Sequence, residues 1–241
     1  MTSIDAPTRT RSFIDLRAWV ADATAADASG DAFLSARASL PLAGGPITVG
    51  LIALPAGTGR VDAMPADEFV IVESGAVEIE QDGRVIAMTE GDSIVLRGGA
   101  AFGWTASSES RLIYMRRTGG SAGDGTIIPI DIHAPLAPSG APLAELLVGP
   151  TPSCRNFTDY KSEDGEYMAG TWDSTPYHRR PMTYGHYELM YLLDGSVTFV
   201  DGDGAEGTFS RGDIFLVEQG ASCSWDSQVD VKKIYAIYRP V

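Results

Sequence analysis

The chain of 241 residues contains the same pattern twice, and this internal repeat limits its fold more than any other feature. The two copies span residues 50–114 and 170–235. Matching landmarks lie 120 residues apart in the first half of each copy and 121 residues apart in the second half. The pairs are Gly50 and Gly170, Glu68 and Glu188, Gly75 and Gly195, Gly91 and Gly212, Gly99 and Gly220, Trp104 and Trp225, and Tyr114 and Tyr235. Two copies of one supersecondary unit indicate a duplication that yields two similar modules.

Short β-rich segments broken by Gly, Pro and Asp make up each copy, which predicts an all-β fold. In the first copy Val77 and Ile79 alternate with glutamates, the period of a strand with one buried face. Asp82 and Gly83 follow and are typical of a tight turn. Sheets of short, evenly spaced strands close into barrels or sandwiches.

The N-terminal region predicts one short amphipathic helix before the first strand. Residues 12–15 fit a helix capping box, and Phe13, Leu16 and Val20 recur at helical spacing. We expect the first strand near residues 33–40. Glycine-rich and proline-rich segments then separate the two copies. The resulting division is an N-terminal barrel with its leading helix at 1–118, a linker at 119–126 and a C-terminal barrel at 127–241.

Composition limits the partners of the chain. A formal net charge of −14 argues against binding to nucleic acid, which needs clustered Lys and Arg. No apolar run reaches the length of a membrane span, so we expect no membrane partner. Only Cys154 and Cys223 are present, which indicates no disulfide framework and favours the cytoplasm. The expected partner is a small-molecule ligand, with a homodimer as a further option.

Both copies share a spacing of specific residues that resembles the cupin superfamily. Each has a Glu, six residues and a Gly, then a Gly-Asp pair whose Gly is followed eight residues later by another Gly. A Trp five residues further on and a strand that ends in an aromatic residue, such as Tyr235, are similar to the ethanolamine-utilisation-like cupins. The duplicated arrangement is similar to the ureidoglycine aminohydrolase-like cupins. The resemblance implies two tandem jelly-roll β-barrels, a bicupin. It implies no single activity, because cupins include many kinds of enzyme as well as storage and sugar-binding proteins.

The resemblance also implies where a metal would bind, and few of the required residues are present. Cupin metal sites combine two histidines one residue apart, a glutamate and a third histidine. No histidine precedes His133, so we expect no metal in the N-terminal barrel. In the C-terminal barrel we expect no cofactor; the alternative is a nonstandard divalent metal site built from His178, His186, Glu188 and Cys223.

Comparison of the two copies predicts that the C-terminal barrel holds the working pocket. Its polar and aromatic residues correspond to mostly small or apolar residues in the first copy, such as Ile52, Met64, Ala66 and Phe102. A few convergent polar groups in an apolar lining are what small-molecule pockets need. The predicted pocket residues are Trp172, His178, Arg180, Tyr184, His186, Glu188, Cys223 and Trp225.

Structural roles remain open for several of these residues. Trp225 recurs as Trp104 and can serve packing alone, and Cys223 can be a small buried apolar residue. Arg180 can pair with an acidic neighbour or clamp a substrate carboxylate. His178 can lie at an exposed loop edge.

Three functional hypotheses follow. The first is an enzyme that acts on a small polar or anionic metabolite by acid/base chemistry, with His186 and Glu188 as the pair and Tyr184 assisting. In it, Trp172, His178, Arg180, Cys223 and Trp225 bind the substrate. The second is a metabolite-binding or sensing protein without catalysis. The third is a structural or storage duplication with both barrels filled.

Overall fold

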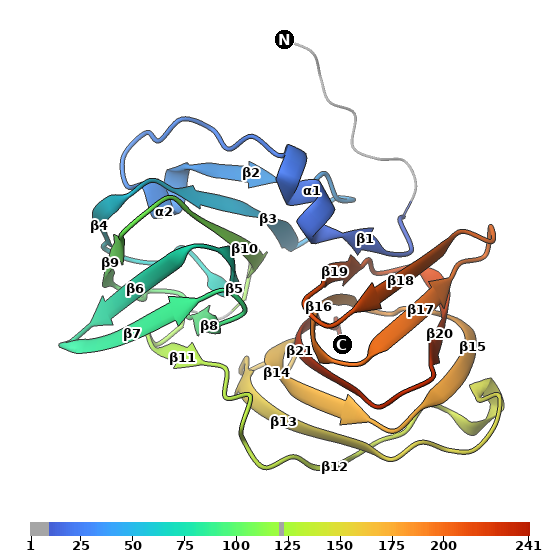
Figure 1. Ribbon diagram of the computed structural model, residues 1–241. Helices are drawn as coiled ribbons and strands as arrows, with labels where there is room; N and C mark the ends of the chain where they lie inside the picture. Colours follow the sequence, from blue (N-terminus) through green and yellow to red (C-terminus); the bar gives the residue numbers. More distant parts are fainter. Residues whose placement is uncertain (1–9, 121–122) are drawn as a thin grey trace. The chain divides into compact units, whose positions relative to one another are not determined.

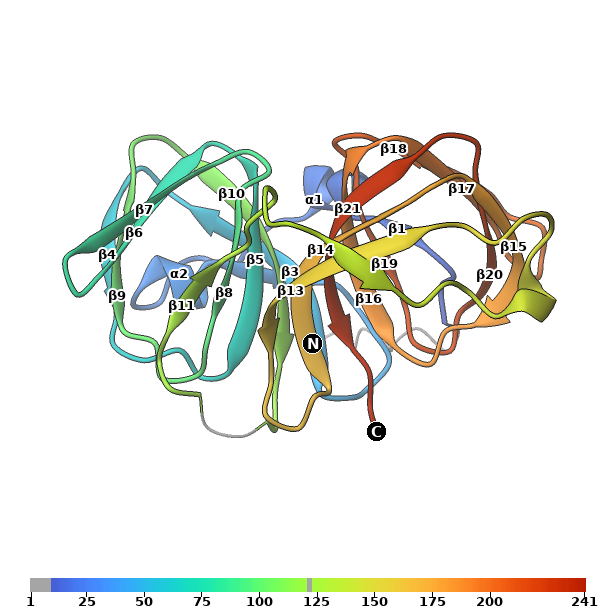
Figure 2. The same cartoon turned by 90° about the horizontal axis from the view of Figure 1, so that it is seen from below.

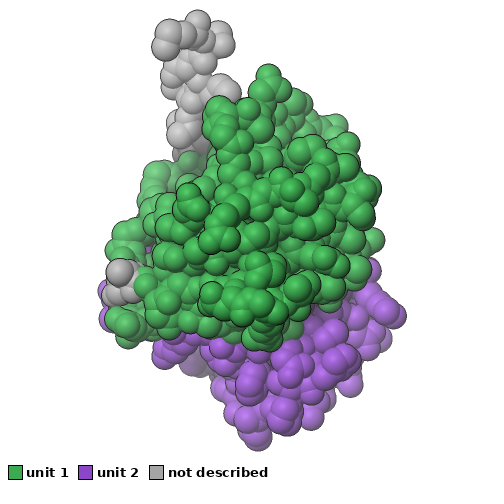
Figure 3. Space-filling view, turned by 90° about the vertical axis from the view of Figure 1, so that its left-hand side faces the viewer, with its two compact units in different colours: residues 1–8, 18–130, 162–164 green, residues 9–17, 131–161, 165–241 purple. Residues whose placement is uncertain are grey.

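A computed structural model describes residues 10–120 and 123–241 of the chain. These residues form two compact units (Figure 3). The first, here called the N-terminal barrel, contains residues 18–120, 123–130 and 162–164. The second, the C-terminal barrel, contains residues 10–17, 131–161 and 165–241. The linker positions 121–122 and the first nine residues of the predicted N-terminal domain lie outside the described residues.

The N-terminal barrel consists of two antiparallel sheets (Figure 1). Helices α1 (Leu16–Asp22) and α2 (Ala32–Ser35) precede them. One sheet has the order β11 (Ile127–Pro129), β8 (Ser93–Leu96), β5 (Asp67–Ser74), β10 (Ser110–Arg117), β3 (Ile47–Leu54) and β2 (Arg37–Ser39). The other has the order β4 (Gly57–Val61), β9 (Phe102–Ala106), β6 (Ala76–Gln81) and β7 (Arg84–Thr89). Apolar side chains of both sheets meet in one core.

The C-terminal barrel repeats this plan with one additional strand. Its larger sheet has the order β1 (Ile14–Asp15), β19 (Ile214–Val217), β16 (Tyr187–Asp194), β21 (Val231–Tyr238), β14 (Tyr167–Ser174), β13 (Cys154–Lys161) and β12 (Ala137–Ser139). The smaller sheet has the order β15 (Tyr177–Thr183), β20 (Ser222–Ser227), β17 (Ser196–Val200) and β18 (Glu206–Ser210). A 3₁₀ turn, η1 (Ala144–Leu146), lies between β12 and β13. The predicted all-β tandem fold is therefore confirmed.

The two repeat glutamates occupy the same place in their sheets. Glu68 on β5 pairs with Leu96 and Arg116, while Glu188 on β16 pairs with Val217 and Ile237. Leu96 and Val217 are 121 residues apart, as are Arg116 and Ile237, and this is the offset between the later landmarks of the repeat. The duplicated pattern thus encodes the same strand order and the same register.

The segments that precede each copy differ from the predicted division. β11 pairs with β8 of the N-terminal barrel, although residues 127–129 were expected in the C-terminal domain (Figure 2). β1 pairs with β19 of the C-terminal barrel, although residues 14–15 were expected in the N-terminal domain (Figure 1). Each short strand covers an edge whose backbone groups would otherwise lack partners, which explains the exchange. The end of the predicted linker also belongs to the N-terminal barrel, where Gly125 N–H donates to the Gly98 carbonyl.

The start of the chain differs from the sequence prediction in two further places. The helix begins at Leu16, and the predicted capping residues Ile14 and Asp15 are in β1. Phe13 therefore leaves the helix and packs near the rings of Phe199 and Phe209. Residues 33–35, expected as the start of a strand, lie in α2 instead, because Asp31 accepts a hydrogen bond from Phe33 N–H and caps the turn.

Helix α2 inserts the side chain of Phe33, here called the Phe33 plug, into the core of the N-terminal barrel. Phe33 is fully buried and meets the ring of Phe102 edge-on, with ring centroids 5.1 Å apart. Phe102 stands at the repeat position that Cys223 holds in the other barrel. The predicted turn is confirmed nearby, since Asp82 and Gly83 both have positive φ. Across residues 10–120 and 123–241, the structure has no helix with the length and apolar composition needed to cross a lipid bilayer.

Candidate functional site

A cavity of about 360 Å³ lies in the C-terminal barrel. Strands of both sheets line it, including Ser139 at the end of β12, together with residues 140–142 between β12 and η1. The lining includes Trp172, Tyr177, Arg179, Tyr184, His186, Glu188, Trp225, Lys233 and Arg239. Apolar Met168, Met182 and Ile237 complete much of the wall. The volume lies at the small end of the range typical of ligand pockets.

Glu188 lies at the centre of a buried charged cluster. Its Oε1 accepts a hydrogen bond from Lys233 Nζ at 2.7 Å, and its Oε2 contacts His186 Nε2 at 3.2 Å. All three residues are less than one tenth exposed. Burial by itself raises the pKa of Glu188, but the Lys233 charge and the His186 hydrogen bond outweigh it and hold that pKa well below its usual range. Glu188 is therefore a carboxylate at neutral pH.

Lys233 lies between two aromatic rings as well as beside Glu188. Its Nζ is 4.9 Å from the ring centroid of Trp172 and 5.0 Å from that of Trp225. Trp172 and Lys233 are direct partners on β14 and β21, which brings their side chains to the same face. Tyr177 stacks on Trp225 at 5.6 Å and holds that wall in place. Aromatic faces and a carboxylate together stabilise the ammonium.

Arg179 forms the second cationic wall of the cavity. Its Nη2 donates to Tyr184 Oη at 3.1 Å, and its guanidinium lies over the Tyr184 ring. The residue is 4% exposed, yet its Nη1 has no hydrogen-bond partner among the described residues. Burial raises the pKa of Tyr184 despite the nearby Arg179, so Tyr184 remains a neutral phenol that can donate a hydrogen bond.

Five of the eight predicted pocket residues line the cavity: Trp172, Tyr184, His186, Glu188 and Trp225. His178 and Arg180 do not, because both side chains are exposed. Strand alternation explains the difference, since Tyr177 and Arg179 on β15 take the inward positions and their neighbours point outward. A register irregularity between Arg179 and Met182 keeps Met182 in the lining.

Cys223 is fully buried in the apolar core and does not line the cavity. Burial raises the pKa of its thiol to about 11, so Cys223 is a neutral apolar residue near pH 7. The alternative metal site from His178, His186, Glu188 and Cys223 is therefore not assembled. Within the described parts of the chain, no group of three His, Cys, Asp or Glu residues is placed to hold a metal ion. The two oxygens of Glu188 are already engaged, so the residues present do not fit the metal that the superfamily resemblance implies.

Sequence reasoning missed Arg179, Lys233 and Tyr177. Lys233 lies two residues before the repeat landmark Tyr235, so strand alternation places both on one face, and this signal could have identified it. Arg179 and Arg180 are adjacent, and sequence alone does not state which one faces inward. Tyr177 corresponds to Gly57 of the first copy, so the comparison of the two copies could have identified it.

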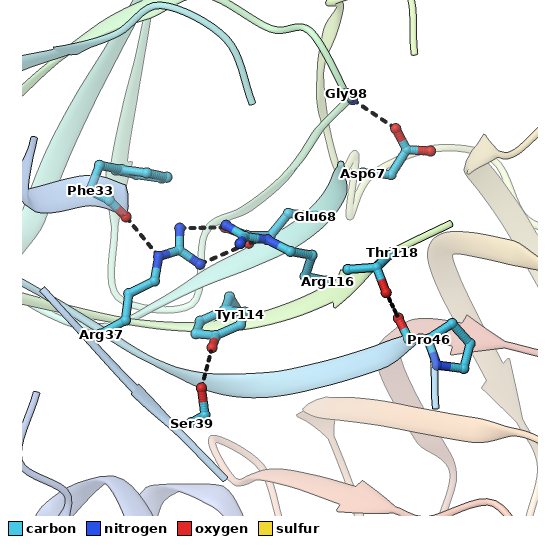
Figure 4. A network of polar contacts seen from close by, with 10 residues as sticks. All are labelled: Phe33, Arg37, Ser39, Pro46, Asp67, Glu68, Gly98, Tyr114, Arg116 and Thr118. Atoms are coloured by element: carbon cyan, nitrogen blue, oxygen red, sulfur yellow. Dashed lines mark hydrogen bonds and ion pairs between the residues drawn. The ribbon is translucent and has the colours of Figure 1, made fainter. Parts of the chain in front are cut away.

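The N-terminal barrel holds its glutamate in a closed network (Figure 4). Glu68 is fully buried and accepts two hydrogen bonds from Arg37, at 2.8 and 2.9 Å. Arg116 Nε donates to the same carboxylate at 2.6 Å. The Arg37 guanidinium lies over the ring of Tyr114, 4.5 Å from its centroid, and donates to the Phe33 carbonyl. Protein groups thus saturate this carboxylate.

Comparison with known proteins agrees with this architecture. The model of the EutQ-like cupin domain matches twice, at residues 42–114 and 161–235. No curated protein matches the chain. Among solved structures, a DUF861-family protein of unknown function from Pseudomonas syringae pv. tomato str. DC3000 is 29% identical, with a TM-score of 0.82. That match covers 89% of this chain and 92% of the other.

More distant solved structures share the fold alone. Protein Ylba from E. coli, also of the DUF861 family, is 15% identical with a TM-score of 0.60, covering 99% of this chain and 96% of its own. A salicylate 1,2-dioxygenase from Pseudaminobacter salicylatoxidans is 13% identical with a TM-score of 0.54, and the match covers 84% of this chain and 76% of the dioxygenase chain. With its domain model matched in both halves, the chain belongs to the EutQ-like cupin family and is a bicupin.

Proposed function

We propose that the C-terminal barrel binds a small organic anion and acts on it by proton transfer through His186. The observation that carries the proposal is Arg179, which lines the cavity and whose buried Nη1 has no hydrogen-bond partner among the described residues. A buried donor left without an acceptor costs free energy, and a ligand carboxylate would satisfy it. A guanidinium is also the side chain best shaped to hold a carboxylate.

The charge of the cavity supports an anionic ligand. Arg179, Lys233 and Arg239 line it, and Glu188 is the single carboxylate among the described lining residues. The chain as a whole carries a net charge of −14, so this local excess of cations differs in sign from the protein. Such a site concentrates anions and disfavours cationic ligands.

The apolar part of the lining supports a ligand with a flat or apolar body. Trp172, Tyr177, Trp225 and two methionines provide this surface, while the cations and Tyr184 provide the polar one. A single ligand can meet both surfaces if its charged group contacts Arg179 and its remaining atoms lie against the aromatic rings.

His186 and Glu188 support catalysis in addition to binding. The imidazole lies at the cavity wall, and the buried carboxylate holds one of its ring nitrogens. A carboxylate that orients an imidazole is a recurrent acid/base arrangement. The Tyr184 ring centroid lies 5.2 Å from that of His186, so the Tyr184 hydroxyl is a further hydrogen-bond donor in the same region.

Binding is tested by titration with acetate and benzoate, with benzamide as the uncharged control. We expect benzoate to bind and benzamide to fail. Arg179→Gln should weaken benzoate by about 10- to 150-fold, the equivalent of ~1.5–3 kcal/mol for a charged hydrogen bond. The neighbouring Arg180→Gln is a matched control, because its side chain is exposed, and it should leave the affinity unchanged. Equal losses from the two variants would contradict the assignment.

Catalysis is tested separately from binding. Carboxylic acids with an exchangeable α-hydrogen, such as pyruvate, are incubated in D₂O, and deuterium incorporation is followed by NMR. We expect exchange with the wild type and none with His186→Gln, which should still bind the acid through Arg179. Binding without exchange in the wild type would favour the alternative of a metabolite-binding or sensing protein.

A further inference from the structure

Each barrel buries one glutamate at the same place in its larger sheet, and side-chain cations neutralise both. Arg37 and Arg116 are the cations that bind Glu68, whereas Lys233 is the cation that binds Glu188, which the His186 imidazole also contacts. A buried carboxylate without a cation is costly, so both barrels need one at this place. The same requirement is met twice with side chains of this chain.

The cations come from different positions in the two copies. Lys233 pairs with Trp172 on β14, and the residue at the corresponding place in the N-terminal barrel is Leu112, which pairs with Ile52. Arg116 corresponds in register to Ile237. The lysine is therefore not a remnant of the repeat pattern but a feature of the C-terminal barrel alone.

The two arrangements also differ in what they leave available. In the N-terminal barrel, the Phe33 plug and two guanidiniums enclose Glu68. In the C-terminal barrel, Lys233 lines the cavity. An ammonium has three protons, and over residues 10–120 and 123–241 Lys233 Nζ has two acceptors, Glu188 Oε1 at 2.7 Å and Met190 Sδ at 3.1 Å. The third N–H has no acceptor among these residues.

We infer that Lys233 is the built-in cation of the C-terminal site: its ammonium occupies the position beside Glu188 that a metal ion would need, and its third N–H binds an oxygen of the ligand. The first part follows from the contacts around Glu188 and is independent of any ligand. The second part rests on the proposed function, because it requires that the cavity bind an anion. Together they make the site independent of metal and give the ligand two nitrogen cations, Lys233 and Arg179.

Metal uptake tests the first part. Chelator-treated wild type, Lys233→His and Lys233→His/Glu188→Gln are incubated with Zn²⁺, desalted and analysed for metal. Lys233→His brings a second imidazole beside His186 and Glu188, so it should retain about one Zn²⁺ per chain, while wild type and the double variant should retain none. Lys232→His is the matched control on the same strand and should also retain none.

Two results would overturn the first part. One is stoichiometric metal in the wild type that Glu188→Gln removes, because a metal would then coexist with the ammonium. The other is a folded Lys233→His variant that takes up no metal. Circular dichroism establishes folding, and the wild-type arm decides the question even if the variant is unfolded.

Benzoate binding in chelator-containing buffer tests the second part. The comparison is between Glu188→Gln and Glu188→Gln/Lys233→Met, because each of these variants avoids a buried carboxylate without a cation. We expect the added Lys233→Met change to weaken benzoate at least tenfold. Equal affinities would overturn the contact. If benzoate and acetate both fail to bind the wild type, the proposed function fails, and metal uptake alone decides the role of Lys233.

Discussion

Replacement of Lys233 by Met should destabilise the C-terminal barrel in a strongly pH-dependent manner. Met keeps the apolar contacts of the lysine stem with Trp172 and Trp225 but removes the charge 2.7 Å from Glu188. Breaking a buried ion pair by removing one partner typically costs ~3–5 kcal/mol, because the other charge remains buried. His186 still contacts Glu188, so we expect the lower end, about 3 kcal/mol at pH 7.5.

The sign of the pH dependence follows from the pKa of Glu188. The pKa of Glu188 is depressed in the folded wild type. The ionised carboxylate therefore stabilises the fold above the usual glutamate pKa, and this stabilisation is lost as pH falls through the pKa of Glu188 in the folded protein. Without Lys233, burial raises the pKa of Glu188 instead, and the carboxyl becomes protonated at mildly acidic pH. The deficit of the variant should therefore shrink as pH falls from 7.5 toward 4.5.

Urea unfolding measures this deficit at both pH values, followed by circular dichroism and tryptophan fluorescence. Lys232→Met is the matched control: Lys232 Nζ donates to the Ile132 carbonyl and has no contact with Glu188. The control should show a small deficit that is similar at both pH values. A Lys233→Met deficit that is the same at pH 4.5 and 7.5 would refute the assignment of the loss to an unpaired carboxylate.

Three other perturbations test the structure elsewhere. Phe33→Ala should destabilise the N-terminal barrel by ~3–5 kcal/mol by removing its plug while leaving benzoate binding unchanged, and lost binding would contradict a filled first barrel. Burial is the main cause that raises the pKa of Asp159 to about 6. The free-energy cost of ionising Asp159 in the folded protein therefore grows as pH rises from about 4 through 6. Asp159→Asn should stabilise by about 1 kcal/mol at pH 8, discounted for partial exposure, and have no effect at pH 4; equal gains at both values would contradict this. Gly170→Ala should reduce the folded yield, because a Cβ there overlaps the Phe157 carbonyl, whereas Gly185→Ala meets open space and is the control.

The sequence by itself determined the architecture, because strand period, turn glycines and the repeat are local signals that occur twice. The offset between landmarks predicted that Glu68 and Glu188 are equivalent, and their strand register is the same. The asymmetry between copies also indicated a pocket in the C-terminal barrel, where Trp172, His186 and others line a cavity. These features depend on residue type and spacing along the chain.

Tertiary structure decided what depends on one-residue register and on contacts between distant segments. Whether Arg179 or Arg180 faces inward depends on the pairing of β15, and a shift of one residue exchanges the two faces. Lys233 and Glu188 are 45 residues apart in the chain, and they are in contact only because β21 lies beside β16. The exchange of β1 and β11 depends on which sheet edges lack a partner, a property of the assembled sheets that spacing along the chain does not contain.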